Sequence, residues 1–336
     1  MRGLRFGRQA LAGCVTAFVL AGCSGSQPSI GPSGSTTQSV AMPTRVDRSG
    51  SWMLPEAKGD DLLYVSTTFK TYVDSYPQGK LVGELAEGGF YLCADEAGNI
   101  FLSQYTDGTH GILEYAHGGT TRIATIKTAG PPWGCSVDPV TGDLAVAIPD
   151  VAGIYHGELA IYKHGRGRPR VFSDESAIKY IFFCRYDASG DLFIDGTPAY
   201  RYSPYLAELP HGSQTITNLT LTGEFYPVSD IEWDGSYLAV ADGLAGAVDR
   251  ISVSGSSATI VSTVPLQHWR FRPAARQVWI YRNRLITSPG RHDAAAIWHY
   301  PEGGELFRRL PPDFDRQQVE GVVVSLAPHT DLSEKL

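Results

Sequence analysis

The stretch Leu113-Glu-Tyr115-Ala-His-Gly118 is one copy of a motif that returns six times along this 336-residue chain and decides its fold. The motif is an apolar residue, an aromatic or apolar residue, one or two spacers, and Gly. The other copies are Val73-Asp-Ser-Tyr76-Pro-Gln-Gly79, Ile161-Tyr162-Lys-His-Gly165, Leu206-Ala-Glu-Leu209-Pro-His-Gly212, Ile251-Ser-Val253-Ser-Gly255 and Ile297-Trp-His-Tyr300-Pro-Glu-Gly303. Successive glycines are 39, 47, 47, 43 and 48 residues apart, a period typical of units that must stack to bury their faces.

A second repeat, offset from the first, marks other turns. Its copies lie between short apolar runs and read Asp95-Glu-Ala-Gly98, Asp138-Pro-Val-Thr-Gly142, Asp187-Ala-Ser-Gly190 and Asp234-Gly235. Such punctuation is typical of β-hairpins, so we expect strand A before each Asp and strand B after it. The glycine motif then closes the hairpin of strands C and D. A degenerate copy at 269–279 has lost both the Asp and the Gly, and we expect it to hold the same turn in another unit.

The two repeats together predict an all-β fold, a six-bladed β-propeller. Val319 to Pro328 has the sequence of a strand A with no strand B after it, whereas Asp61 to Val65 has that of a strand B with no strand A before it. We expect these two segments to pair and close the ring, because closure removes exposed sheet edges. The predicted propeller spans residues 58–330, followed by a tail at 331–336.

The N-terminus has the pattern of an export signal. Three arginines at positions 2, 5 and 8 precede an apolar stretch, Leu11 to Leu20, that is too short to span a bilayer. The stretch ends in Leu20-Ala-Gly-Cys23, which resembles the bacterial lipobox. The resemblance implies a signal peptide at 1–22 and lipidation of Cys23, with palmitate among the expected acyl groups. An ordinary cleaved signal peptide is the alternative.

The residues around this signal refine the expected location. Leu11-Ala-Gly-Cys14 has the same letters but almost no apolar segment before it, so Cys14 is assigned to the signal. Where the source has two membranes, Ser24 after the cysteine implies anchoring in the outer membrane, facing the periplasm or the surface. Residues 23–57 are rich in Ser, Gly and Pro and are expected to form a flexible tether.

Composition limits the partners. The precursor has 28 basic and 35 acidic residues, net −7, and loss of the three signal arginines makes the mature chain −10. Nucleic acid is therefore not expected as a partner. Of the cysteines outside the signal and the lipobox, Cys93, Cys135 and Cys184 fall in expected strands A, with Cys93 on the opposite face of its strand. We interpret them as small buried side chains rather than a disulfide framework. A Cys135–Cys184 bridge is the alternative.

Resemblance to known propellers implies which face binds a ligand. In those families the B–C loops and the D–A connections share the ligand face. Here that face is expected to collect an aromatic set for a protein or glycan of the cell envelope: Tyr105, Trp133, Tyr155, Tyr200, Tyr202 and Tyr226. Trp133 has a second interpretation, as a plug of the channel mouth.

The histidines suggest an alternative. His117, His164 and His211 occupy the same turn in three successive units, too far apart for one metal, and are interpreted as exposed turn residues. No cofactor is predicted, but Ca²⁺ or Zn²⁺ is possible at the channel mouth, with candidate ligands His156, His268, His292, Asp230 and Glu232.

Two functions follow from these observations. Leu238-Ala-Val-Ala-Asp242 with Val248-Asp-Arg-Ile251 resembles the NHL repeat, so the chain looks like a lipoprotein with an NHL/TolB-like propeller. The first function is a monomeric, lipid-anchored binding or scaffold module. The alternative is a metal-dependent propeller enzyme similar to lactonases, esterases or lyases. The chain contains no nucleophile elbow, phosphate loop or HExxH motif.

Overall fold

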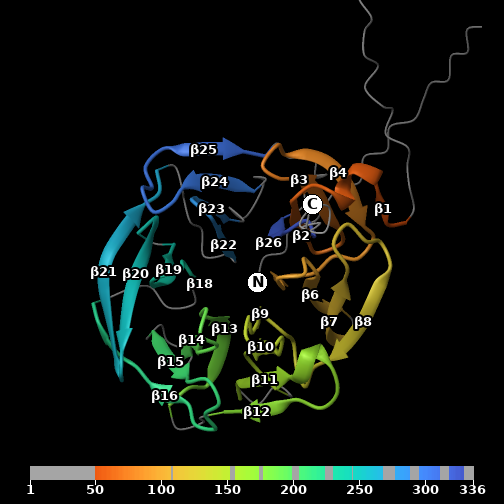
Figure 1. Ribbon diagram of the computed structural model, residues 1–336. Coiled ribbons are helices and arrows are strands. Elements are labelled where there is room, and N and C mark those ends of the chain that lie inside the picture. The colour runs from red at the N-terminus through yellow and green to blue at the C-terminus, as the bar shows by residue number, and fades with distance from the viewer. Residues whose placement is uncertain are drawn as a thin grey trace, which may run out of the picture. The chain divides into compact units, whose positions relative to one another are not determined.

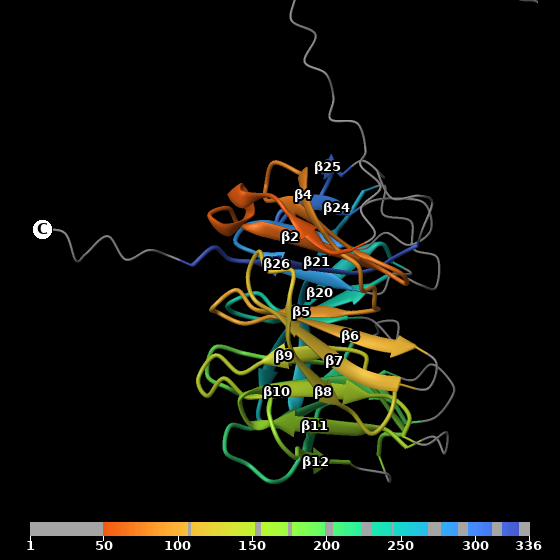
Figure 2. The ribbon, with the colours of Figure 1, turned by 90° about the vertical axis from the view of Figure 1, so that its right-hand side faces the viewer.

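The computed structural model describes residues 50–106, 109–151, 156–173, 177–198, 204–223, 230–243, 245–267, 277–287, 295–310 and 318–328. Within these segments the chain forms six sheets arranged in a ring (Figure 1), which confirms the six-bladed β-propeller. Each sheet is one blade, and its inner strand A lies nearest the centre of the ring. Figure 2 shows β9, β10, β11 and β12 following one another in the order in which they pair.

The strands of each blade are given from strand A outward. Blade 1 contains β26 (Val319–Ser325), β2 (Leu62–Thr67), β3 (Thr71–Ser75), β4 (Lys80–Leu85) and β1 (Trp52–Met53). Blade 2 contains β5 (Leu92–Ala94), β6 (Ile100–Thr106), β7 (Thr109–Tyr115) and β8 (Arg122–Lys127). Blade 3 contains β9 (Cys135–Val137), β10 (Leu144–Ile148), β11 (Glu158–Tyr162) and β12 (Arg170–Phe172).

The second half of the ring follows the same order. Blade 4 contains β13 (Tyr180–Tyr186), β14 (Leu192–Thr197), β15 (Tyr205–Leu209) and β16 (Thr217–Asn218). Blade 5 contains β18 (Ile231–Trp233), β19 (Leu238–Asp242), β20 (Ala247–Ser254), β21 (Ser257–Pro265) and β17 (Thr220–Thr222). Blade 6 contains β22 (Val278–Tyr281), β23 (Arg284–Thr287), β24 (Ala296–His299) and β25 (Leu306–Arg309). Two short 3-10 helices, η1 (Pro55–Lys58) and η2 (Lys163–Gly165), complete the described elements.

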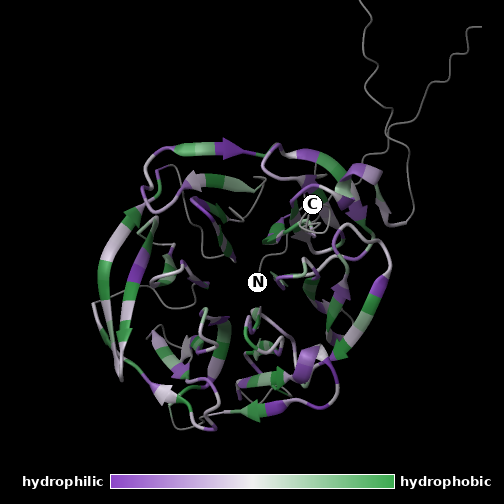
Figure 3. Cartoon of the chain, in the orientation of Figure 1, coloured by the Kyte–Doolittle hydropathy of each residue, from purple (hydrophilic) through white to green (hydrophobic). Residues whose placement is uncertain are grey.

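Burial explains the pattern of apolar and polar residues in the strands. The middle strands β2 and β10 are buried along their whole length, whereas the outer strand β21 alternates exposed and covered residues. Figure 3 shows this alternation as bands of hydrophobic and hydrophilic residues on the outer strands. The largest buried apolar cluster extends through blades 6, 1, 2 and 3, and three smaller clusters complete the core of the described chain.

The ring closes as the terminal sequences predict. β26 pairs antiparallel with β2, from Leu62 opposite Ser325 to Thr67 opposite Val319. β26 is buried throughout, so the last described strand serves as strand A of the first blade. The first blade also begins earlier than expected, because Trp52 and Met53 pair with β4 although they lie within the segment assigned to the tether.

Both repeats occupy the turns predicted for them. All six motif glycines lie between strands C and D with positive φ, from 58° at Gly118 to 73° at Gly212. A left-handed backbone conformation is unfavourable for a residue that carries a side chain, which explains why glycine recurs at these turns. At the A–B turns, Asp95, Asp138 and Asp187 accept backbone N–H bonds from residues two to four positions later.

The A–B turn of blade 6 differs from the prediction. β22 is strand A, and the turn is Arg282-Asn283, with Arg282 at φ 53°. The expected turn at 269–279 is therefore wrong, because its last residues already belong to strand A. Residues 269–276 of that degenerate copy lie outside the described residues.

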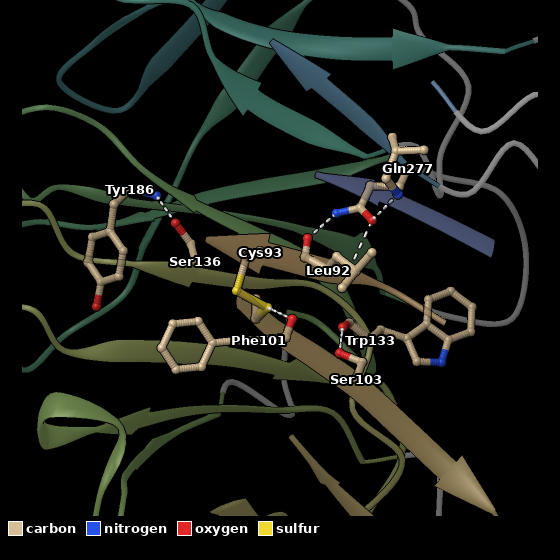
Figure 4. Close-up of a disulfide and its surroundings, with 10 residues drawn as sticks. Leu92, Cys93, Phe101, Ser103, Trp133, Ser136, Tyr186 and Gln277 are labelled. Carbon is tan, nitrogen blue, oxygen red and sulfur yellow. Dashed lines mark hydrogen bonds between the residues drawn. A yellow bond between two sulfur atoms is a disulfide. The ribbon is translucent and has the colours of Figure 1, made fainter. Parts of the chain in front are cut away.

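The interpretation of the cysteines is corrected by a disulfide between Cys93 of β5 and Cys135 of β9, with Cα atoms 5.7 Å apart (Figure 4). The alternative Cys135–Cys184 bridge is wrong as well, because Cys184 is a buried free thiol. Face-to-face sheets lie about 10 Å apart, but inner strands converge towards the ring axis and come closer. Cys93, on the opposite face of its strand, meets Cys135 of the next blade.

The turn histidines are not equivalent. His164 and His211 are exposed, as interpreted from the sequence. His117 is instead half-buried, with Nδ1 2.7 Å from Ser325 Oγ and Nε2 3.1 Å from the Asp60 carbonyl oxygen. It therefore links blade 2 to the closing strand β26.

Candidate functional site at the channel mouth

A cavity of about 630 Å³ lies where the central channel opens among the A–B turns. All six blades line it, chiefly through the ends of their strands A and the turns that follow, with Phe101, Glu114 and His164 added from blades 2 and 3. Its aromatic wall includes Trp233 of blade 5 and Trp279 and Tyr281 of blade 6. This volume is within the range of about 300 to 1,000 Å³ that is usual for small-molecule sites.

The inner wall of the cavity holds one arginine. Arg185 Nη2 lies 2.9 Å from Glu232 Oε2, and the two side chains are only 18% and 3% exposed. The guanidinium also lies over the Trp279 ring, 4.4 Å from its centroid. Since an unpaired buried charge is costly, the pair and the ring contact explain how Arg185 is held inside the channel.

Two acids of blade 5 lie beneath the cavity. Burial raises the pKa of Glu232 well above its usual range, although the nearby Arg185 acts against this shift. Burial likewise raises the pKa of Asp230 to about 8, against the hydrogen bonds that its carboxylate accepts. Those bonds come from the Val278 N–H at 2.8 Å and the Ile231 N–H at 2.9 Å, so this carboxylate holds β18 against β22.

The rim of the cavity is acidic. Asp95, Glu96, Asp138 and Asp187 contribute to it, and we call these four residues the acidic rim. The three aspartates are fixed by the turn bonds described above, whereas Glu96 is exposed. The three aspartate carboxylates are therefore held in place before any ligand arrives.

Gln277 links strands from three blades near the opposite end of the channel (Figure 4). Its side-chain oxygen accepts the Leu92 N–H of blade 2 at 3.0 Å and the Val322 N–H of blade 1 at 3.1 Å. Its amide nitrogen donates to the Leu92 carbonyl oxygen. This side chain joins the beginnings of β5 and β22 to the middle of β26.

Two of the aromatic residues expected to bind a ligand, Trp133 and Tyr105, fall within the described residues, and both lie on the other side of the ring from the cavity. Trp133 packs in an aromatic cluster, 5.6 Å from the Tyr91 ring and 4.9 Å from the Phe182 ring. Tyr105 is 45% exposed and stacks on His110 at 4.9 Å. The others, Tyr155, Tyr200, Tyr202 and Tyr226, lie outside the described residues, as does Cys23.

The candidate metal ligands are only partly described. His156 Nε2 lies 3.7 Å from Glu158 Oε1, while His268 and His292 lie outside the described residues. Asp230 and Glu232 are buried in the contacts given above. Within the described segments, no group of three or more His, Cys, Asp or Glu side chains is placed to hold a metal ion.

Sequence reasoning missed the cavity because it searched the loops of the opposite face. A signal was available, since the residue directly before each turn Asp lines the cavity: Ala94, Val137, Tyr186 and Trp233. The position of Arg185, two residues before Asp187, follows from the same register.

The comparisons with solved structures find the same fold. A chain of the nidogen/laminin complex is 13% identical with a TM-score of 0.63, covering 80% of this chain and 99% of that one. A functionally unknown protein from Desulfotomaculum acetoxidans is 11% identical with a TM-score of 0.54, covering 79% and 99%. Apo AztD from Citrobacter koseri is 9% identical with a TM-score of 0.50, covering 80% and 99%.

At these identities the similarity establishes the propeller fold alone. No protein-family model and no curated protein sequence matches the chain. Among the described residues, no helix is long and apolar enough to cross a bilayer.

Proposed function

We propose that this protein is a lipid-anchored binding module of the cell envelope, with an NHL/TolB-like propeller that holds a protein or glycan partner. The observation that carries the proposal is the cavity of about 630 Å³ that all six blades line. Small-molecule sites are concave, with apolar and aromatic walls and a few precisely placed polar groups. The exposed Tyr105 on the opposite side belongs to a second, separate contact surface.

Two features support the envelope location. The lipobox-like Leu20-Ala-Gly-Cys23 provides an anchor, and the Cys93–Cys135 disulfide is the kind of bond that persists in oxidising compartments. Cys23→Ala should move the protein from the membrane fraction to the soluble fraction and abolish acyl labelling. Cys14→Ala is the matched control and should change neither. Retained acylation of the Cys23→Ala variant would refute the anchor.

The binding site is tested by blocking the cavity. Ala188 lines it on an exposed A–B turn, so Ala188→Trp fills its mouth without entering the core. The neighbouring exposed Ser189 does not line the cavity, and Ser189→Trp is the matched control. Chemical crosslinking in intact envelopes should trap a partner on the full-length protein and on Ser189→Trp but not on Ala188→Trp. Equal crosslinking of both variants would show that the cavity is not the site.

A further inference from the structure

The charges around the cavity narrow the class of its ligand. Arg185 is the single lysine or arginine among the lining residues, whereas five acids line it: Asp95, Glu96, Glu114, Asp138 and Asp187. Glu114 is neutralised by Arg166, whose Nη1 lies 2.5 Å from its carboxylate. In the part of the chain that the structure describes, the acidic rim forms no ion pair.

Arg185 does not cancel this negative charge. Its guanidinium lies 2.9 Å from Glu232, and it is one cation against the four carboxylates of the acidic rim, which therefore set the sign of the net charge at the cavity mouth. The rim aspartates are fixed by backbone N–H bonds, and a fixed charge loses little entropy when a ligand binds. An approaching cation therefore gains attraction without reorganising the turns.

The aromatic wall favours the same class of ligand. Arg185 over Trp279 shows that a guanidinium already packs against this wall, at 4.4 Å from the ring centroid. Trp233 and Tyr281 line the cavity and are partly exposed. The Arg282 guanidinium lies 4.9 Å from the Tyr281 ring centroid, a second guanidinium against this wall. Ring faces and carboxylates together attract an organic cation more than a small hydrated ion.

We propose that the cavity among the A–B turns binds an organic cation, a guanidinium or ammonium group, between the acidic rim and the Trp233 and Tyr281 rings. This inference rests on the proposed binding function and specifies its ligand. The cation is either a free amine or guanidine or a basic side chain of a peptide, because both carry the same chemistry.

The test measures binding to the full-length protein by calorimetry at low salt. The probes are N-acetyl-arginine amide, N-acetyl-lysine amide and the peptide Gly-Gly-Arg-Gly-Gly, with N-acetyl-glutamine amide and N-acetyl-glutamate amide as neutral and acidic controls. A cationic probe should bind, and the two controls should not. Binding of the free amides identifies a small molecule, whereas binding of the peptide alone identifies a basic side chain.

Variants separate this site from general attraction to an acidic protein. Ala188→Trp keeps the charge and should abolish binding, whereas Ser189→Trp should leave it unchanged. Glu96→Gln should weaken binding about two- to five-fold, because one rim charge is lost. Glu302→Gln, an exposed residue of the blade 6 C–D turn, removes the same charge elsewhere and should have no effect.

The outcomes distinguish the two proposals. If no cationic probe binds, or if the acidic control binds equally well, the cation inference is overturned. It is overturned as well if Glu302→Gln weakens binding as much as Glu96→Gln. The proposed function then survives only if Ala188→Trp still prevents partner crosslinking. If Ala188→Trp loses neither probe binding nor partner crosslinking, both proposals are overturned.

Discussion

At the scale of single residues, His117 couples the ring closure to pH. Its ring lies between Ser325 of β26 and the Asp60 carbonyl oxygen, and burial lowers its pKa although that carbonyl and the charge of Asp61 act against the shift. The Ser325 hydroxyl donates to the Gly98 carbonyl oxygen, so Ser325 Oγ can only accept a hydrogen bond from His117 Nδ1. Burial of the ring opposes its protonation.

The lowered pKa of His117 predicts a loss of stability in mild acid. A folded pKa below the unfolded value of about 6.5 means that the unfolded chain binds the proton more readily. The free energy of unfolding should therefore fall as the pH drops below about 6.5. His117→Asn should be roughly 1 kcal/mol less stable at pH 8 and should lose part of this pH dependence in urea titrations. His211→Asn, at the exposed equivalent turn, is the control, and an unchanged pH profile in His117→Asn would contradict the role.

At the scale of elements, the Cys93–Cys135 bond ties β5 to β9 across a sequence separation of 42 residues. Because such a crosslink restricts the unfolded chain, the Cys93→Ala/Cys135→Ala double variant should lose about 2 to 4 kcal/mol of unfolding free energy. Guanidinium denaturation of the full-length protein without reductant measures it. Cys184→Ala keeps the disulfide and is the control. Reduced wild-type protein should match the double variant, and equal midpoints for all forms would show that the bond does not stabilise the ring.

The turns and strands also show how much of the structure the sequence predicts. Local rules predicted the turns, because a left-handed glycine such as Gly165 and an N–H-binding aspartate such as Asp187 depend on nearby residues only. The turn Arg282-Asn283 carries neither signal and was missed. The disulfide was missed for another reason, since it depends on how closely the inner strands converge on the ring axis. That distance is set by all six blades together.

At the scale of the whole molecule, β26 closes the ring, because it completes blade 1 and contacts the inner strands of both neighbouring blades. Gly321 lies at the most crowded point of this strand. A Cβ there would be 2.5 Å from the Phe90 carbonyl oxygen of blade 2 and 2.6 Å from the Gln277 side-chain oxygen of blade 6. The closing strand therefore cannot take a side chain here without displacing both neighbouring blades.

Closure predicts that damage to β26 weakens every blade at once. Gly321→Ala should cost about 1 to 3 kcal/mol of unfolding free energy, the usual range for overpacking a core. A chain ending at residue 317 should lose the single cooperative transition, because β2 is left as an open edge. Calorimetry and hydrogen exchange test both variants. Gly212→Ala, at an open left-handed turn in blade 4, is the control for backbone strain. Its additional hydrogen exchange should stay within blade 4. If Gly321→Ala raised exchange in blade 1 alone, the blades would be independent units, and a cavity built from all six would have no common rigid frame.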